Sequence, residues 1–204
     1  LCSSRDELRH AEILQCGADE IKRFAGENFD AVILNSVAQY FPDADYLVRF
    51  IRSALEALAP GGRLFLGDLR NLCLLRAYHA SVALFQAEEA LPTHELEARV
   101  RDNIAHEEEL LVDPALFAML ADTMPELQGV RYHLKRGVNR NELIRYRYDV
   151  TLTRACGDQT RPRAEMHRTA WPDRGLTEAE LHERLTGLGG ASMLLTGIPD
   201  ARSS

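Results

Sequence analysis

The sequence has few cysteines and no long apolar run, and both absences limit the classes of protein to which it can belong. Its four cysteines, Cys2, Cys16, Cys73 and Cys156, form no CxxC pair and no cluster with histidines at zinc-ligand spacing. No stretch approaches the ~18 apolar residues of a membrane helix, and no basic segment followed by an apolar one signals export. We therefore expect no metal site, no membrane span and a reduced, cytoplasmic compartment.

Basic residues are fewer than acidic ones. The 204 residues include 24 Lys and Arg against 31 Asp and Glu, which gives a net charge of −7 and a pI near 5.5. This balance argues against a nucleic-acid partner. The hydrophobic share of 46% and the charged share of 27% are ordinary for a globular protein. The length suits one domain or slightly more.

The first third of the chain alternates apolar runs with helical patterns. Apolar runs at Ala11–Cys16, Ala31–Leu34 and Arg63–Gly67 lack the alternation of half-exposed strands, which is typical of strands buried on both faces. Tyr46–Leu58 has apolar residues at helical spacing. The order strand, helix, strand, helix, strand over residues 11–68 predicts an α/β fold with a mostly parallel sheet.

Residues 69–127 interrupt this alternation with helical patterns alone. These patterns cover Leu72–Ala90, Thr93–Glu109 and Asp113–Met124. A helical stretch of ~55 residues is too long for a single crossover between strands. We expect these helices, at about 72–127, to form a cap over the carboxyl edge of the sheet, where open α/β sheets bind ligands.

The last part of the chain predicts an antiparallel edge and a small extension. Val130–Lys135 and Tyr146–Thr153 alternate in hydrophobicity, which indicates an antiparallel strand pair at the sheet edge. We expect a linker or long loop over 156–175, a helix over Leu176–Leu188 and a short strand over Met193–Ile198. The predicted domain therefore covers 1–155, and 156–204 form a linker with a helix–strand extension.

Polar residues gather in the loops that follow the predicted strands, at the edge where doubly wound sheets bind ligands. Asn35–Pro42 combines an amide, a hydroxyl, a phenol and an aromatic ring, which suit an amino-acid-like or adenine-like ligand. Capping of the next helix by Asn35 and Ser36 is the alternative. Asp19 is a candidate acceptor for an exocyclic amine, or else a simple turn residue.

Several long motifs, in order along the chain, resemble a known family. The resemblance is to the S-adenosylmethionine (SAM)-dependent methyltransferase domains embedded in nonribosomal peptide synthetases, which are class I methyltransferases. It extends over residues 11–154, with a weaker echo at Gly175–Arg202. The motifs that carry it are Asp30–Pro42 (DAVILNSVAQYFP), Ala59–Asn71 (APGGRLFLGDLRN), Ala77–Ser81 (AYHAS), Glu107–Pro114 (EEELLVDP), Lys135–Gly137, Asn141–Leu143 and Arg145–Val150 (RYRYDV).

One part of the family pattern has no counterpart in the sequence. In class I methyltransferases the first strand ends in a Gly-rich turn beneath the methionine part of SAM, and an acidic residue after the second strand binds the ribose. The residues before Ala11 supply neither, and the chain opens at Leu1 in a helix-compatible stretch. The clustered glycines Gly187, Gly189 and Gly190 follow a predicted helix, which indicates a C-cap and turn.

The resemblance therefore implies the second two-thirds of a catalytic domain, a Rossmann-like sheet with its N-terminal strands missing. We expect a piece of a longer polypeptide that keeps the adenine side and the substrate side of the site. An NAD-type Rossmann domain is a weaker interpretation, because no GxGxxG motif follows a strand.

The resemblance also assigns cofactor-binding roles. It places Ala18 and Asp19 in the loop that touches the adenine of SAM, with Asp19 toward the exocyclic amine. Asn35, Ser36 and Val37 would line the methionine side. Tyr40 would lie near the transferred methyl group.

For catalysis the sequence offers one histidine and several acids. His79 is the candidate general base, because neutral imidazole is available near pH 7; a histidine of a cap helix bonded to a carboxylate is the alternative. Glu108 or Glu109 would orient that base or hold a substrate ammonium, or else belong to a solvated helix face. Asp68 and Asn71 follow the third strand, where substrate contacts or helix caps are expected.

The resemblance implies methyl transfer to an aminoacyl or peptidyl group held on the phosphopantetheine arm of a carrier protein, and we expect nitrogen rather than carbon or oxygen as the acceptor. The alternative is an inactive methyltransferase-like scaffold that organises neighbouring synthetase domains. Residues 131–168 hold ten Lys and Arg against four Asp and Glu. This segment would present a basic face to the arm or to an acidic carrier protein, or else be a solvated strand-pair surface.

Overall fold

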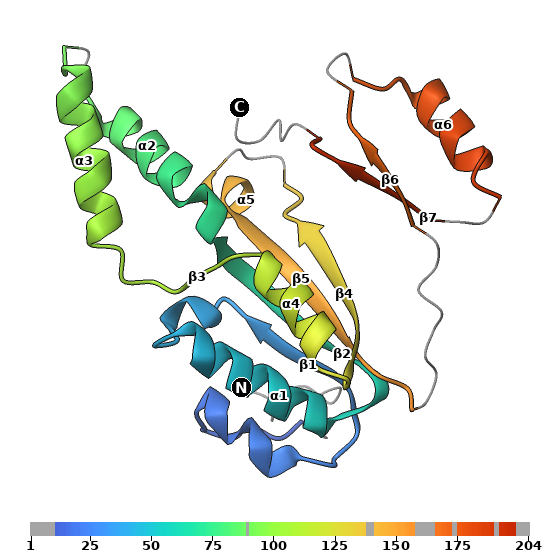
Figure 1. The fold of residues 1–204 in the computed structure, drawn as a ribbon. Helices are drawn as coiled ribbons and strands as arrows, with labels where there is room; N and C mark the ends of the chain where they lie inside the picture. Colours follow the sequence, from blue (N-terminus) through green and yellow to red (C-terminus); the bar gives the residue numbers. More distant parts are fainter. Residues whose placement is uncertain are drawn as a thin grey trace.

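The structure is a computed structural model that describes residues 11–88, 90–137, 141–157, 166–172, 175–189 and 192–198 (Figure 1). Its centre is a five-stranded sheet. The strands of this sheet are β1 (Phe29–Asn35), β2 (Leu58–Asn71), β3 (Leu111–Val112), β4 (Leu127–Leu134) and β5 (Arg147–Arg154).

Helices and 3-10 turns connect these strands. In chain order they are η3 (Ala18–Phe24), η4 (Ala38–Tyr40), α1 (Ala44–Ala57), η5 (Leu72–Leu74), α2 (Leu75–Gln86), α3 (Thr93–Ala105), α4 (Ala115–Thr123) and α5 (Glu142–Arg145). In the part of the chain that the structure describes, no helix is both long and apolar enough to span a bilayer.

The sheet has the order β1-β2-β5-β4, with β3 beside the end of β2. β1 and β3 pair with β2 in parallel, whereas β5 is antiparallel to both of its neighbours, β2 and β4. The predicted α/β fold with a mostly parallel sheet and an antiparallel pair at its edge is therefore confirmed. The structure adds that β5, the later strand of that pair, lies between β2 and β4, and that β4 is the edge strand.

One face of the sheet is covered by α1 and α4, and the core lies between them. The N-cap of helix α1 is Asp43, whose side chain accepts a hydrogen bond from the Tyr46 amide at 2.7 Å. Its buried residues recur at helical spacing and meet Leu64 and Leu66 of β2. Phe117 of α4 is fully buried in the same cluster. Each such aliphatic or aromatic side chain contributes about 1.5–3 kcal/mol on burial.

The opposite face of the sheet differs from the prediction. The apolar run Ala31–Leu34 predicts a strand buried on both faces, but Ile33 is 71% exposed. Val32 and Leu34 point to the core face and are half-buried. The difference arises because, among the described residues, the helices α1 and α4 both pack on the core face.

The segment before η3 also differs from the prediction. Residues Ala11–Cys16, predicted to be a strand, are exposed and have no regular secondary structure. An extended segment becomes a strand only by pairing its backbone with a neighbour. Among the described strands none pairs with this segment, so its apolar run alone does not make it a strand.

The predicted cap consists of two helices rather than three. Helices α2 and α3 pack against each other and extend beyond the carboxyl end of β2 (Figure 1). Helix α4 instead packs on the sheet through Phe117 and Leu120, and β3 separates it from α3. Apolar side chains that can reach the core therefore draw α4 out of the cap.

A small second sheet follows the main one. β6 (Met166–Ala170) and β7 (Ser192–Thr196) pair in parallel, and α6 (Glu178–Thr186) lies between them in sequence. The predicted helix and final strand are present. β6, however, occupies part of the segment 156–175, which was predicted to be a linker or loop. The prediction missed this strand because the segment is polar and its pairing with β7 is not visible in the sequence.

Gly67 of β2 provides a test of this packing. A methyl group there would overlap Oδ1 of Asn35 and lie 2.6 Å from Cε1 of Phe65. We predict that Gly67→Ala lowers the free energy of unfolding by about 1–3 kcal/mol, measured by urea denaturation. Gly129→Ala is the matched control, because a Cβ on Gly129 meets nothing within 4 Å. Equal effects of the two changes would contradict the packing described.

Candidate active site

The carboxyl ends of β1 and β2 meet in an unusual backbone arrangement. Asn35 pairs with Gly67, and the next residue of each strand, Ser36 and Asp68, has a left-handed φ of 56° and 66°. Residues other than glycine rarely adopt this conformation, which costs about 1–3 kcal/mol and is concentrated at functional sites. The Ser36 amide donates to the Gly67 carbonyl at 3.2 Å, and Ser36 Oγ donates to Asp68 Oδ2 at 3.1 Å. The two strained residues therefore hold each other in place.

Asp68 is also the centre of a charge network. Its carboxylate forms ion pairs with Arg147 Nη1 at 2.7 Å and Lys135 Nζ at 3.3 Å. Asp149 takes the second contact of Lys135 at 2.7 Å and accepts the Asp68 amide at 2.7 Å. Between Leu66 and Leu69, β2 has one residue more than β5, which frees that amide from the ladder.

This network changes the interpretation of the basic segment 131–168. Lys135 and Arg147 are paired with carboxylates, and Arg154 donates to the carbonyl of Leu58. The charges of Lys135 and Arg147 are therefore neutralised by the chain's own carboxylates. Asp68, predicted as a substrate contact, acts here as a junction between Ser36 and these cations.

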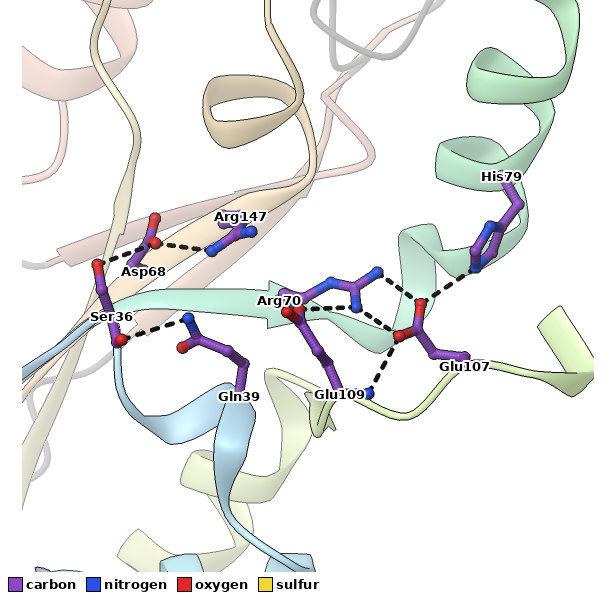
Figure 2. Close-up of polar contacts among 8 residues, drawn as sticks. All are labelled: Ser36, Gln39, Asp68, Arg70, His79, Glu107, Glu109 and Arg147. Atoms are coloured by element: carbon purple, nitrogen blue, oxygen red, sulfur yellow. Dashed lines mark hydrogen bonds and ion pairs between the residues drawn. The ribbon is translucent and has the colours of Figure 1, made fainter. Parts of the chain in front are cut away.

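A second cluster is built around Arg70, two residues further along β2 (Figure 2). Its guanidinium donates to both oxygens of Glu107 at 2.7 Å each and to Glu109 Oε2 at 2.9 Å. His79 Nε2 lies 3.1 Å from Glu107 Oε2. The Glu109 amide donates to Glu107 Oε1 at 3.1 Å. Arg70, Glu107 and His79 thus form a hydrogen-bonded chain.

Glu107 is held firmly in its ionised form. Hydrogen bonds from Arg70 outweigh burial and lower the pKa of Glu107 from its usual 4.5 to about 2. Burial disfavours the charge of Arg70, but its hydrogen bonds to Glu107 raise the Arg70 pKa above the usual value. Because an ionised carboxylate only accepts hydrogen bonds, His79 Nε2 must carry a proton. The second ring nitrogen, Nδ1, is then the basic one whenever the imidazole is neutral.

The second cluster borders a cavity of about 660 Å³. Arg70 and Arg147 of the sheet line one side, and His79 and Tyr78 of α2 line another. The Arg70 guanidinium lies 5.0 Å above the Tyr78 ring, which packs edge-on against Tyr146. The cavity therefore has polar groups fixed by rigid neighbours, as a binding site requires.

Asp19, the predicted adenine contact, lies beside α1. Tyr46 donates its hydroxyl to Asp19 Oδ1 at 3.0 Å, and the Asp19 amide donates to the Tyr46 oxygen at 3.1 Å. Burial and the hydrogen bond to Asp19 raise the pKa of Tyr46. A cavity of about 210 Å³ lies between these residues and Arg49. A Cβ on Gly17 would come within 2.6 Å of Asp19 Oδ1, so a larger residue there would displace this carboxylate.

The role of Asp19 as an adenine contact stays a prediction, and one of its carboxylate oxygens is open to a ligand. Asp19 Oδ2 accepts no hydrogen bond from the described residues and is exposed, so it is available to an exocyclic amine. Ala18 begins η3 next to it and packs partly against the core. The ring of Phe41 lies 4.6 Å from that of Tyr46, which links Asp19 through Tyr46 to the loop after β1.

The remaining predicted residues have varied surroundings. Asn35 donates to Ser36 Oγ at 3.2 Å and caps no helix, since the N-cap of η4 is Val37 and no side chain caps this turn. Val37 is 40% and Tyr40 72% exposed at the surface of this loop. Asn71 Oδ1 accepts the Cys73 amide at 3.0 Å, so Asn71 is a cap of η5, the alternative given for it.

Sequence reasoning missed three residues of the site, which are Glu107, Arg70 and Gln39. Glu107 makes the contact with His79, whereas the predicted neighbour Glu108 is exposed. Arg70 was missed although it stands in a resembling motif, because nothing in a sequence shows which acid an arginine meets. Gln39 is 6% exposed, and its side-chain amide donates to the Ser36 backbone carbonyl at 3.3 Å. Its backbone carbonyl accepts a hydrogen bond from the Leu110 amide. It therefore ties the Ser36 loop to the acidic segment.

Comparison with known proteins identifies the family. Residues 2–66 match a family described as a methyltransferase domain. A chondramide synthase of Chondromyces crocatus is 40% identical over 206 residues, covering 98% of this chain and 5% of that protein. The chain belongs to the SAM-dependent methyltransferases. A probable nonribosomal peptide synthetase of Salinispora arenicola is 41% identical to this methyltransferase chain over 135 residues, covering 66% of the chain and 2% of that protein.

These findings confirm the predicted family, methyltransferase domains of nonribosomal peptide synthetases, and SAM as the cofactor. The methyltransferase chain spans only a few per cent of the length of these relatives. A solved SAM-dependent methyltransferase from Archaeoglobus fulgidus is 10% identical, with a TM-score of 0.43, over 73% of this chain and 72% of that one. The roles of the individual residues stay predictions.

The ion pair of Glu107 generates a prediction about stability. Because its pKa falls from 4.5 to about 2 on folding, the stabilisation is present above pH 4.5 and is lost as the pH falls toward 2. We predict that Glu107→Gln lowers the free energy of unfolding at pH 7 by about 2 kcal/mol. Chemical denaturation should show this difference shrink between pH 4.5 and 2. Glu108→Gln is the exposed control, and a difference that does not vary with pH would refute the ion pair.

Proposed function

We propose that this methyltransferase chain methylates the amino group of an aminoacyl or peptidyl substrate carried on a phosphopantetheine arm within a peptide synthetase. The observation that carries this proposal is the chain Arg70–Glu107–His79, which ends at the wall of the 660 Å³ cavity. It supplies a base whose proton position is fixed by a permanently charged carboxylate.

The chemistry needs an acceptor with a free lone pair. Bound SAM supplies a methyl group on a positively charged sulfur, which makes that carbon an electrophile. The acceptor nitrogen forms a bond to the methyl carbon as the carbon–sulfur bond breaks. Before this step the substrate ammonium gives one proton to Nδ1 of His79, which leaves an imidazolium stabilised by Glu107. The methylated product leaves as an ammonium, and the imidazolium returns its proton to water. Alignment supplies most of the acceleration in such a displacement, so the rigid floor of the cavity matters as much as the base.

The charges of the cavity favour an amine over a carbon or oxygen acceptor. Four glutamates line it against two arginines, so its field attracts a positively charged group. Both arginines are paired with carboxylates, and Glu108 and Glu142 add further negative charge. An ammonium substrate would be drawn in and would then lose its proton to His79 before methylation.

The cofactor would reach this cavity from the loops after β1 and η3. Ala18 and Asp19 would hold the adenine, and Asn35, Ser36 and Val37 the methionine part. Tyr40 would lie near the methyl group. The Ser36–Asp68 pair supports this placement, because it holds the turn after β1 in a strained conformation.

A second candidate function is an inactive scaffold for neighbouring synthetase domains. The exposed face of β1 and β2, where Ile33 is 71% exposed, favours this alternative as a surface for other domains. The two functions differ in whether the polypeptide that contains this chain binds SAM.

Titration of SAM by calorimetry tests the cofactor site. We predict that Asp19→Ala weakens SAM binding roughly tenfold, because the exocyclic amine would lose a charged acceptor. Asp30→Ala, a change of an exposed carboxylate on β1, is the control and should leave the affinity unchanged. If the polypeptide binds no SAM at all, the scaffold function is favoured.

Methyl transfer at saturating SAM tests the base. We predict that His79→Ala lowers the turnover number roughly 10²-fold with little change in SAM affinity, since His79 faces the substrate side. His94→Ala is the control, because His94 is an exposed residue of α3. Unchanged turnover of the His79 variant would remove the proposed role.

A further inference from the structure

Two arginines lie directly opposite each other at the floor of the large cavity. Arg70 of β2 and Arg147 of β5 are paired residues in the antiparallel ladder, and both line the cavity. Like charges directly opposite in a sheet are destabilising. Their pairing is therefore maintained by the carboxylates around them, which are Glu107 and Glu109 for Arg70 and Asp68 for Arg147.

The two guanidinium groups are engaged to different extents. Arg70 makes three short contacts to carboxylates, and its face is covered by Tyr78. Arg147 uses only Nη1, which binds Asp68 at 2.7 Å (Figure 2). A guanidinium has five N–H donors in a rigid fork. The other donors of Arg147 meet no partner among the described residues, and its side chain is 16% exposed where it borders the cavity.

The free donors of Arg147 suit an oxygen acceptor on a bound molecule. A guanidinium forms its strongest hydrogen bonds with carboxylates and phosphates, and it also donates to neutral carbonyl oxygens. Of the chain's own carboxylates around the cavity, Glu107 and Glu109 are bonded to Arg70, and His79 contacts Glu107. Glu108 and Glu142 also line the cavity. The cavity thus offers an oxygen-binding guanidinium together with a base and several acids.

We propose that Arg147 binds the carbonyl oxygen adjacent to the amine that is methylated, so that the site recognises an α-aminoacyl group by both its carbonyl and its amine. This inference rests on the proposed function and makes Arg147 a determinant of substrate specificity. It also links substrate to cofactor, because Asp68 holds Arg147 with one oxygen, Oδ2, which also accepts the Ser36 hydroxyl. A carbonyl bound to Arg147 places its amine at a fixed position relative to the Ser36 turn.

Two acceptors that differ only in the carbonyl group test this role. One is an aminoacyl thioester of pantetheine, and the other is the matching thioether, in which a methylene replaces the carbonyl. Initial rates of methyl transfer are measured for both with the polypeptide that contains this chain. The wild type should prefer the thioester roughly tenfold or more in kcat/KM, because the thioether leaves Arg147 without its acceptor.

The Arg147→Gln variant should lose this preference. We expect KM for the thioester to rise roughly tenfold, because the carbonyl loses its donor. KM and kcat for the thioether should change by less than about twofold, as is usual when an interaction that the substrate does not use is removed. Lys135 still contacts Asp68 in this variant, so the Ser36 turn keeps a charged partner. Arg76→Gln is the control, because Arg76 is an exposed residue of α2 with a surface ion pair.

The outcomes separate the two proposals. If the wild type methylates both acceptors and Arg147→Gln lowers both rates equally, Arg147 has only a structural role and the inference is wrong. The same holds if the wild type shows no preference for the thioester. If neither amine is methylated although SAM binds, the proposed function itself fails. Calorimetry can also measure the affinity for the two acceptors without turnover. The affinity should show the same loss of preference for the thioester in Arg147→Gln.

Discussion

The buried guanidinium of Arg70 is the interaction on which the site depends. It lies at the end of β2, next to the point where β3 joins the sheet, and binds acids from the segment that follows α3. An unpaired charge at this depth would be costly, whereas a paired one with well-made hydrogen bonds is tolerated. The pairing therefore fixes where the segment after α3 returns to the sheet. His79 of α2 is then held against Glu107, so one buried charge organises the sheet, the returning segment and the cap.

A second set of contacts ties the strand ends together on the cofactor side. The extra residue of β2 turns the Asp68 amide toward Asp149 and lets its carboxylate reach Ser36. Left-handed backbone at two non-glycine residues would relax if these contacts were absent. Arg147 borders the cavity and also binds Asp68, so the two networks share the same floor. The central residues of the two networks, Arg70 and Asp68, both lie on strand β2, which suits a reaction that depends on alignment.

Much of the fold was predictable because its cause is local. Apolar residues at helical spacing are visible in any single sequence, and α1 lies at Ala44–Ala57 where Tyr46–Leu58 was predicted. The acidic run was predicted to assist the base or hold the substrate, but Glu108 and Glu109 were chosen over Glu107. Three consecutive glutamates are equivalent in a sequence, and only the position of Arg70 decides which of them is buried. Similarly, the strand β6 was not visible, because its pairing partner is more than twenty residues away.

The sequence by itself determined the fold class and the family, since both follow from patterns and motifs that are read along the chain. It also placed polar residues at the carboxyl edge of a parallel sheet. Tertiary structure decided which of those residues meet: Ser36 with Asp68, and His79 with Glu107. Such contacts depend on distances between strands and on the direction of single side chains. Those are fixed by packing of the whole sheet, and no local pattern encodes them.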